Sequence, residues 1–220
     1  MALADGRVPV NVCVDACMTL RNAYGQLGVR AELLPVDLAI QSEDGGGTRY
    51  GSLTPSCTGT SWNGHCVLVL PDSERFVDAT VEQFDEIREI GMAPMVGKVA
   101  LSAHDPQDGF LMEPGAQVVL QRGDLMLTYT VAGPEALASI VEHPEAVAHA
   151  DGHLRTGVNV ASLTLAALRG EGVRGRAMQA PYPRLRALLR AVGDAPYEAD
   201  DAGDARFRLP DRPIRTGRCR

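Results

Sequence analysis

The sequence predicts an α+β fold, with one helix packed on a small antiparallel sheet and a mostly helical C-terminal region. Three observations carry this prediction. An apolar run with helical spacing lies near the N-terminus, two short apolar runs joined by a turn begin at residue 65, and helix-like segments dominate after residue 133. Strands joined by tight turns pair antiparallel, and strands and helices that segregate along the chain are typical of this class.

The first helix is predicted over residues 15–26. Its apolar residues recur at spacings of three and four, which places them on one helical face: Ala16, Leu20, Ala23 and Leu27. Gly28 is a suitable C-terminal stop, because glycine adopts the left-handed conformation that often ends a helix.

An extended segment is predicted over residues 31–40, where apolar side chains are dense. Pro35 lies inside it and cannot donate a ladder hydrogen bond, which indicates an edge strand or a bulge. Residues 41–64 are polar and rich in Gly, Ser and Thr, so we expect a long loop. Because this loop leads into His65, we expect it to act as a lid over a site there.

Two hairpins are predicted further along the chain. Residues 65–70 and 75–77 are apolar and flank a Pro-Asp-Ser-Glu turn, and residues 117–120 and 125–131 flank an Arg-Gly-Asp turn. Between the hairpins, Thr80 is expected to cap a short helix, with the side chain of a residue three positions later completing a capping box. The following segment is rich in Gly, Pro and Met and is expected to be irregular.

Helices are predicted over residues 134–148, 155–168 and 183–192, and a mobile polar tail over residues 194–220. We therefore expect three parts in the chain. They are a catalytic domain over residues 1–132, a helical region over 133–193, and the tail.

The composition excludes several classes of protein. With 220 residues and a hydrophobic content of 45%, the chain can bury a core, and an aromatic content of 5% makes that core mainly aliphatic. The net charge of −7 argues against nucleic acid and anionic membranes as partners. No apolar run approaches the roughly 18 residues of a membrane span. Five cysteines and no secretion signal predict a cytoplasmic location.

Cys13, His65 and Asp78 are the candidate catalytic residues. Cys13 opens the first helix, His65 opens a strand, and Asp78 ends the next strand. A thiol, an imidazole and a carboxylate placed in this way predict acyl transfer through a thioester. His65 would accept the thiol proton and later protonate the leaving group. Asp78 would hold the imidazole tautomer and stabilise the imidazolium.

The start of the helix favours Cys13 over Cys17 as the nucleophile. A thiol attacks as its thiolate, and the free amides and dipole of a helix N-terminus favour an anion. Cys17 lies one turn further in, where this field has faded. The backbone amide of Cys13 or Val14 is a candidate oxyanion donor, and the side chain of Asn11 is another.

The segment from Cys13 to Gly28 resembles the nucleophile helix of the transglutaminase-like cysteine enzymes, in which a Cys opens a helix that a Leu-Gly pair ends. Bacterial members often have an Asp two residues after the Cys, where this chain has Asp15. The strand led by His65, followed by a hairpin and the Asp-Ala-Thr segment at Asp78, resembles the His strand and Asp-Pro-Thr segment of that family.

The resemblance covers residues 9–86, with two departures. Ala79 stands where the family usually has Pro, and Cys66 stands where an aromatic residue is common. The resemblance implies a papain-like cysteine fold. It also implies that an amide or peptide bond is cleaved through a thioester on Cys13, with His65 as general base and Asp78 as the orienting carboxylate. Hydrolysis is the default outcome, and transfer of the acyl group to an amine is the other.

Two alternatives stay open. Arylamine N-acetyltransferases share the order Cys, His, Asp, which indicates a CoA-thioester-dependent N-acyltransferase. A non-catalytic binding module of the same fold is the second. We expect no cofactor. The expected partners are a peptide, amide or amine substrate, without nucleic acid or membrane, and the C-terminal helices are a candidate surface for a protein partner.

A metal site is the other chemical use of these residue types. Cys13, Cys17, His65 and Cys66 make up a candidate set of four zinc ligands. Adjacent residues of a strand point to opposite faces, so His65 and Cys66 would not face the same ion. Structural zinc sites also have tighter Cys-x-x-Cys pairs. We therefore expect no metal.

Three further predictions concern residues near the candidate site. Asp15 is expected to be a first-turn charge that suits the helix dipole, although it would oppose a thiolate if it pointed at Cys13. Trp62 is interpreted either as a packing anchor or as a wall of a substrate channel. The four histidines other than His65 are expected at the surface: His104, His143, His149 and His153.

Overall fold

The computed structural model describes residues 12–58, 61–90, 94–99, 112–168, 174–192, 198–199 and 205–206. The helices are α1 (Cys13–Leu27), α2 (Asp85–Glu89), α3 (Pro134–Val141), α4 (Pro144–Ala148), α5 (Ala150–Leu168), α6 (Arg174–Gln179) and α7 (Pro183–Val192), with short 3-10 turns η1 (Pro71–Ser73) and η2 (Val81–Gln83). The strands are β1 (Glu32–Ser42), β2 (Gly47–Gly51), β3 (Cys57–Thr58), β4 (Ser61–Trp62), β5 (His65–Leu70), β6 (Arg75–Asp78), β7 (Met95–Lys98), β8 (Gln117–Arg122), β9 (Leu125–Val131), β10 (Glu198–Ala199) and β11 (Ala205–Arg206).

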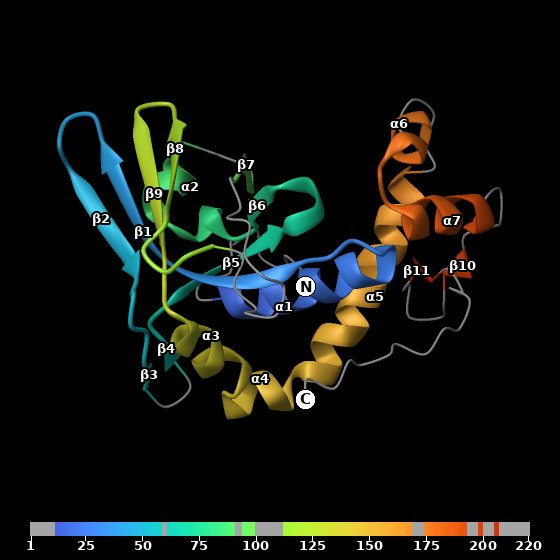
Figure 1. Ribbon diagram of the computed structural model, residues 1–220, viewed down its shortest axis with the longest axis horizontal. Helices are drawn as coiled ribbons and strands as arrows, with labels where there is room; N and C mark the ends of the chain where they lie inside the picture. Colours follow the sequence, from blue (N-terminus) through green and yellow to red (C-terminus); the bar gives the residue numbers. More distant parts are fainter. Residues whose placement is uncertain are drawn as a thin grey trace.

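One antiparallel sheet organises the molecule (Figure 1). Its strand order is β7-β6-β5-β1-β9-β8, and β2 pairs with the second half of β1. The edge strands β7 and β8 approach each other, since Nε of Arg122 donates to Sδ of Met95 at 3.4 Å, and the sheet is nearly closed. The predicted combination of helices with an antiparallel sheet is therefore confirmed.

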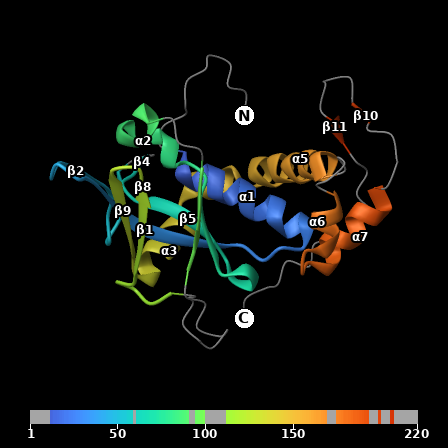
Figure 2. The ribbon, with the colours of Figure 1, turned by 90° about the horizontal axis from the view of Figure 1, so that it is seen from above.

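The two faces of the sheet bury different cores. Alternate residues point to opposite faces of a strand. Along β5, Val67 and Val69 join a cluster with Leu38, Phe76 and Leu127 on one face. The alternate residues of β5 point to the other face, where they pack against α1, and the side chains of α5 and α7 belong to the same core. These residues are Cys66, Leu68 and Leu70. Figure 2 shows α1 alongside α5 and next to β5.

Helix α1 begins at Cys13 and ends at Leu27, so the predicted helix is confirmed. Gly28 follows it with a φ of 74°, the left-handed conformation expected of a glycine stop. A Cβ at this position would lie 2.4 Å from Cβ of Arg184 on α7. Gly28 therefore ends the helix and also admits the close approach of α7.

Pro35 lies where β1 pairs with β5 only, because the ladder to β9 begins at Val36. The carbonyl oxygen of Pro35 accepts from the amide of Ala132, just beyond β9. The amide and carbonyl of a strand residue point the same way, so the missing N–H of Pro35 faces the side beyond the end of β9. Strand β1 lies inside the sheet, between β5 and β9, and its register with β5 is regular through Pro35, so the predicted edge strand or bulge is wrong. Pro35 is tolerated because the ladder to β9 does not extend to its missing N–H.

The long loop predicted over residues 41–64 is wrong. Strand β1 continues to Ser42 and forms a hairpin with β2, and β3 pairs with β4. Gly45, with a φ of 87°, sits in the β1–β2 turn, where the left-handed region suits glycine. Strand β2 is largely exposed, so it has no apolar alternation from which a strand could be predicted.

The helical region differs in detail from the prediction. The helix expected over 134–148 is split into α3 and α4, because His143 precedes Pro144 and has an extended ψ of 129°. Helix α5 begins five residues earlier than expected, and α6 was missed. Helix α7 is confirmed.

The structure also differs from the predictions for residues 87–116 and for the tail over residues 194–220. Residues 87–116 include the end of α2 and the whole of β7, which pairs with β6, so this segment is only partly irregular. In the predicted tail, β10 pairs with β11, and the rest lies outside the described residues. Among the described helices, none combines the length and hydrophobicity that a membrane span requires.

Candidate active site

The fold brings Cys13, His65 and Asp78 together from α1, β5 and β6. The β5–β6 register pairs Leu68 with Val77, and one more pair in the same register places Asp78 opposite Val67. Val67 lies two residues from His65 on the same strand, so His65 and Asp78 share one face of the sheet. Their side chains meet diagonally across the two strands.

His65 and Asp78 form a buried hydrogen-bonded pair. Nε2 of His65 lies 2.8 Å from Oδ2 of Asp78, and the two side chains are 2% and 0% exposed. Oδ2 also accepts from the hydroxyl of Tyr129 at 3.0 Å. Oδ1 accepts from the amide and hydroxyl of Thr80 at 3.0 and 3.3 Å. The carboxylate is therefore fixed in orientation and hydrogen-bonded through both oxygens.

The pair shifts both pKa values in the directions that ionise it. Burial lowers the pKa of His65, but the Asp78 carboxylate and the Cys13 thiol raise it by more, from 6.5 to about 10. Burial raises the pKa of Asp78, but His65 first, and then Thr80 and Tyr129, bring it below its ordinary value of 3.8. Both shifts favour the imidazolium–carboxylate form of the pair.

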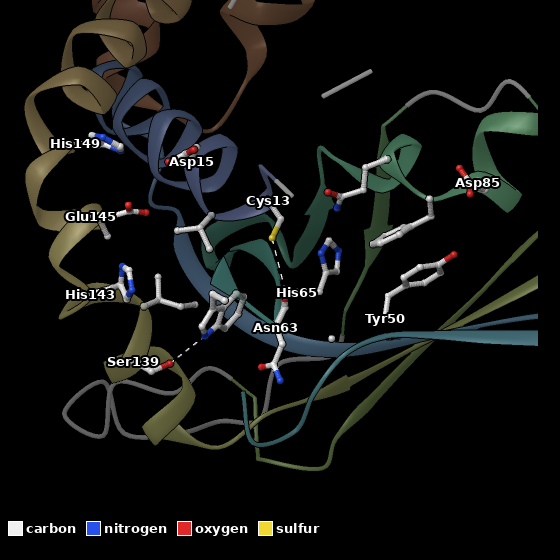
Figure 3. A pocket seen from close by; sticks show the side chains of 18 residues that line it. Cys13, Asp15, Tyr50, Asn63, His65, Asp85, Ser139, His143, Glu145 and His149 are labelled. Atoms are coloured by element: carbon white, nitrogen blue, oxygen red, sulfur yellow. Dashed lines mark hydrogen bonds between the residues drawn. The ribbon is translucent and has the colours of Figure 1, made fainter. Parts of the chain in front are cut away.

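Cys13 is the first residue of α1, and its side chain faces the imidazole of His65 (Figure 3). Its Sγ also lies 4.0 Å from the carbonyl oxygen of Gly64. The first intrahelical bond of α1 runs from the amide of Ala16 to Val12. The amides of Cys13 and Val14 therefore precede the hydrogen-bonded part of the helix, where an anion is favoured.

Cys17 and Cys66 lie deeper, on the α1 face of the sheet. Sγ of Cys17 donates to the carbonyl oxygen of Cys66 at 3.3 Å. The Cys66 thiol and burial hold the pKa of Cys17 well above its ordinary value. Cys66 belongs to the core cluster with Cys17, whereas His65 contacts Phe84 on the opposite face. The two thiols are therefore packing residues.

A pocket of about 530 Å³ opens above Cys13 and His65. Figure 3 shows the two labelled walls, with Tyr50 and Asp85 on one side and helices α3 and α4 on the other. The wall of α3 and α4 supplies four polar side chains: Ser139, His143, Glu145 and His149. The nucleophile candidate thus lies between two walls, one from the sheet side and one from the helical region.

Two glycines admit close contacts around His65. Gly51 has a φ of 89°, and a Cβ there would lie 2.9 Å from the carbonyl oxygen of Val36 and 3.0 Å from the amide of His65. At Gly64, a Cβ would overlap the indole of Trp62 at 2.2 Å. A side chain at position 51 would press on the backbone of His65, and one at position 64 would displace the Trp62 ring.

Trp62 fits both of its interpretations. Its Nε1 donates to Oγ of Ser139 on α3 at 3.2 Å, and the ring packs against the core beside α1, so it anchors the β4 segment. It also lines the pocket. Trp62 therefore links the segment before His65 to the helical region across one wall.

The prediction of surface histidines is wrong for His153. Its side chain is 8% exposed, and its Nε2 lies 2.8 Å from Oδ1 of Asp15. His143 is half-buried and His149 is exposed, and both line the pocket. His104 lies outside the described residues. Sequence periodicity did not detect His153, because its partner is 138 residues away.

Thr80 does not cap η2 with its side chain as expected. Its hydroxyl donates to Asp78 and accepts from Nε2 of Gln83. The Asp-Ala-Thr segment therefore orients the Asp78 carboxylate and does not cap the helix. Tyr129 was missed, although the alternating burial of β9 turns it inward. Its hydroxyl needs a buried partner, and only the curved sheet identifies Asp78 as that partner.

Asn11 lies outside the described residues. In the described part of the chain, no group of three or more His, Cys, Asp or Glu side chains is arranged to hold a metal ion. Comparisons of the chain with protein-family models, with curated proteins and with solved structures each return no match.

Proposed function

We propose that this chain is a transglutaminase-like, cysteine-dependent acyl-transfer enzyme with a papain-like fold, which cleaves an amide or peptide bond through a thioester on Cys13. One observation carries the proposal: the buried His65–Asp78 pair, 2.8 Å between Nε2 and Oδ2, stands beside a thiol at the start of a helix. The thiol of Cys13 has a base beside it, His65, and His65 has an orienting carboxylate beside it, Asp78, as a thiol nucleophile requires.

In the proposed reaction, Sγ of Cys13 attacks the carbonyl carbon of the substrate as a thiolate. A C–S bond forms, and the carbonyl oxygen becomes an oxyanion. The imidazolium of His65 gives its proton to the leaving nitrogen as the C–N bond breaks. The neutral imidazole then takes a proton from water, whose oxygen attacks the thioester. The C–S bond then breaks with its electrons returning to sulfur, the carboxylic acid product leaves, and the thiolate–imidazolium pair is restored.

The raised pKa of His65 supports this order of events. At neutral pH the imidazole already carries the proton that the leaving group needs, and Asp78 stabilises that charge. The amides of Cys13 and Val14, which precede the hydrogen-bonded part of α1, are candidate donors to the oxyanion, since both residues line the pocket.

The CoA-thioester alternative has less support from the pocket. Its described lining contains no Lys or Arg, whereas it contains Asp15, Asp85 and Glu145. The phosphates of CoA are bound mainly by cationic side chains, so this lining suits a peptide, amide or amine substrate better.

The binding-module alternative gives no reason for a buried ionised pair. Taking two charges out of water is expensive, and apolar residues of similar volume often stabilise a core as well or better. Selection for ligand binding alone would not require His65 and Asp78 to be buried beside a thiol. The three described free thiols, Cys13, Cys17 and Cys66, support the proposed cytoplasmic location, because that compartment is reducing.

The test is alkylation by iodoacetamide from pH 5 to 9, read by peptide mass spectrometry, for the wild type and His65→Gln. We expect Cys13 to react at pH 6 at least about 10-fold faster than the same residue in the urea-unfolded chain, and to lose this advantage in His65→Gln. Equal rates in the folded and unfolded wild-type chain would contradict the proposal.

Turnover is tested with a library of fluorogenic peptide amides. Cys13→Ala should abolish hydrolysis while the circular dichroism spectrum stays that of the wild type. Cys17→Ala is the matched control, since it removes a buried thiol from the same helix, and it should retain activity. Substantial hydrolysis by Cys13→Ala would remove the nucleophile assignment.

A further inference from the structure

Asp15 carries a negative charge in the first turn of α1, two residues after Cys13. A carboxylate there suits the helix dipole, but the same charge opposes formation of a thiolate if it faces the thiol. The position of this carboxylate therefore bears directly on the reactivity of Cys13. Figure 3 shows Asp15 turned toward the helical region, whereas Cys13 points toward His65.

His153 on α5 is the partner that holds Asp15 in this position. Nε2 of His153 lies 2.8 Å from Oδ1 of Asp15, and the imidazole is 8% exposed while the carboxylate is 46% exposed. In the described structure, Nδ1 of His153 is buried without a hydrogen-bond partner. Because a carboxylate can only accept, Nε2 is the ring nitrogen that donates to Asp15.

Helices α1 and α5 pack closely enough to keep His153 next to Asp15. Gly157 lies one helical turn after His153, and a Cβ there would be 2.6 Å from Cβ of Asn22, 2.9 Å from the carbonyl oxygen of Thr19 and 3.0 Å from the amide of Ala23. No side chain fits between the helices at this point. The separation of α1 and α5 is thus set by backbone contact, and His153 has little freedom to leave Asp15.

We propose that His153 is a positioning residue of the candidate site: by binding the carboxylate of Asp15, it holds that charge on the α5 side of α1, away from the thiol of Cys13. The inference rests on the proposed function, since it concerns the reactivity of the same thiol. On this proposal, α5 belongs to the catalytic unit, because it supplies His153.

Helix α4 and the two residues that flank it bring further titratable groups close to the pair. His149 stacks edge-on with His153 at a ring-centroid distance of 6.2 Å, and Glu145 and His143 line the same pocket wall as Asp15. Among the described residues that line the pocket, none is Lys or Arg. His153 bonds directly to the Asp15 carboxylate, with 2.8 Å between Nε2 and Oδ1.

The experiment measures the midpoint of the pH profile of Cys13 alkylation by iodoacetamide in the full chain. We compare the wild type with His153→Leu, His153→Gln, Asp15→Asn and the double variant His153→Leu/Asp15→Asn. The released carboxylate should move the midpoint of His153→Leu up by about 0.5–1 pH unit, the scale of one charge in a partly exposed site. His153→Gln keeps a donor and should stay near the wild type.

The double variant distinguishes two causes of a midpoint shift, the charge of Asp15 and the altered packing at position 153. Asp15→Asn alone should change the midpoint little, and it should cancel the shift caused by His153→Leu. A purely structural role would lower the melting temperature of His153→Leu and leave the midpoint unchanged, which would overturn the proposal. A shift that persists in the double variant would overturn it as well.

A replacement variant and the wild-type alkylation rate serve as controls for this experiment. If His153→Leu does not fold, His153→Asn replaces it, because its shorter side chain is polar but does not reach Asp15, and the same upward shift is expected. If wild-type Cys13 shows no accelerated alkylation, the proposed function fails. Failure of the His153 proposal is distinct, because it requires a fast wild-type Cys13 whose profile His153→Leu leaves unchanged.

Discussion

Tyr129 donates a hydrogen bond of 3.0 Å to Oδ2 of Asp78, the same oxygen that accepts from His65. Both residues are buried, and burial together with the Asp78 charge raises the pKa of Tyr129 well above its ordinary value. The hydroxyl therefore stays protonated and keeps donating over the physiological range. Tyr129, on β9, thus holds Oδ2 of Asp78 from the same face of the curved sheet, and Oδ1 is left to Thr80.

Tyr129→Phe should weaken the candidate site without unfolding the chain. Removing one donor from a buried carboxylate should cost about 1–3 kcal/mol of unfolding free energy, measured by urea denaturation. Because Asp78 keeps its bonds to His65 and Thr80, turnover should fall by roughly 3–10-fold rather than vanish. Tyr24→Phe is the matched control, since Tyr24 packs against the core on the α1 face of the sheet and does not line the pocket. Equal losses in both variants would contradict a specific role for Tyr129.

Asp78→Asn should nearly abolish turnover. The amide is uncharged, so it no longer stabilises the imidazolium, and its NH₂ group can present a donor to His65 where an acceptor is needed. We expect a loss of about 100-fold or more in kcat/KM for a peptide amide. Asp37→Asn removes a buried carboxylate that pairs with Arg49 and does not line the pocket, and it should leave kcat/KM within about 3-fold. The comparison fails if Asp37→Asn is as damaging as Asp78→Asn.

The stability of the wild type should depend on pH through His65. The folded-state pKa of about 10 exceeds the ordinary 6.5, so the folded chain holds the proton more tightly. This stabilisation is complete below about pH 6.5 and is lost as the pH rises toward 10. The lowered pKa of Asp78 acts oppositely, and its contribution is lost only as the pH falls below 3.8.

Urea denaturation of the wild type and His65→Gln at several pH values checks this dependence. The difference in unfolding free energy should be largest between about pH 4 and 6.5 and should shrink by more than about 1 kcal/mol by pH 10. A difference that stays flat from pH 6 to pH 10 would show that the pair is not ionised as described.

Cys17 should stay unlabelled in the native chain at pH 8, although it lies one turn from Cys13. Its thiol is buried and bonded to Cys66, and its pKa is well above the ordinary value. Cys17→Ala should cost about 1 kcal/mol through the small cavity it leaves and should not change the labelling of Cys13. Peptide mass spectrometry after iodoacetamide treatment decides this, and rapid labelling of Cys17 would contradict the distinction between the two thiols.

Gly157→Ala should destabilise the chain and loosen α5 from α1. The added methyl group meets backbone atoms of α1 at 2.9–3.0 Å, so the helices must separate, at a cost of about 1–3 kcal/mol. Gly152→Ala is the matched control on the same helix, where a Cβ meets nothing within 4 Å. That change should stabilise the helix by up to about 1 kcal/mol, since Ala is the better helix former. Thermal unfolding that ranks the two variants the other way would contradict the tight contact.

Local features of the sequence were enough to predict several elements. The limits of α1, the hairpin of β5 and β6, and the hairpin of β8 and β9 follow from apolar spacing, a glycine stop and turn residues that act over a few positions. The same reasoning failed for residues 41–64. Strand β2 is exposed and polar there, and its pairing with β1 leaves no periodic pattern in the chain.

By itself, the sequence determined the order and chemistry of the candidate residues: a thiol at a helix start, an imidazole at a strand start and a carboxylate at a strand end. Only the tertiary structure decided their partners. Tyr129 reaches Asp78 across 51 residues, and His153 reaches Asp15 across 138. The reason is physical, because hydrogen bonds between distant segments depend on the curvature of the sheet and the packing of α5 on α1, which no local pattern encodes.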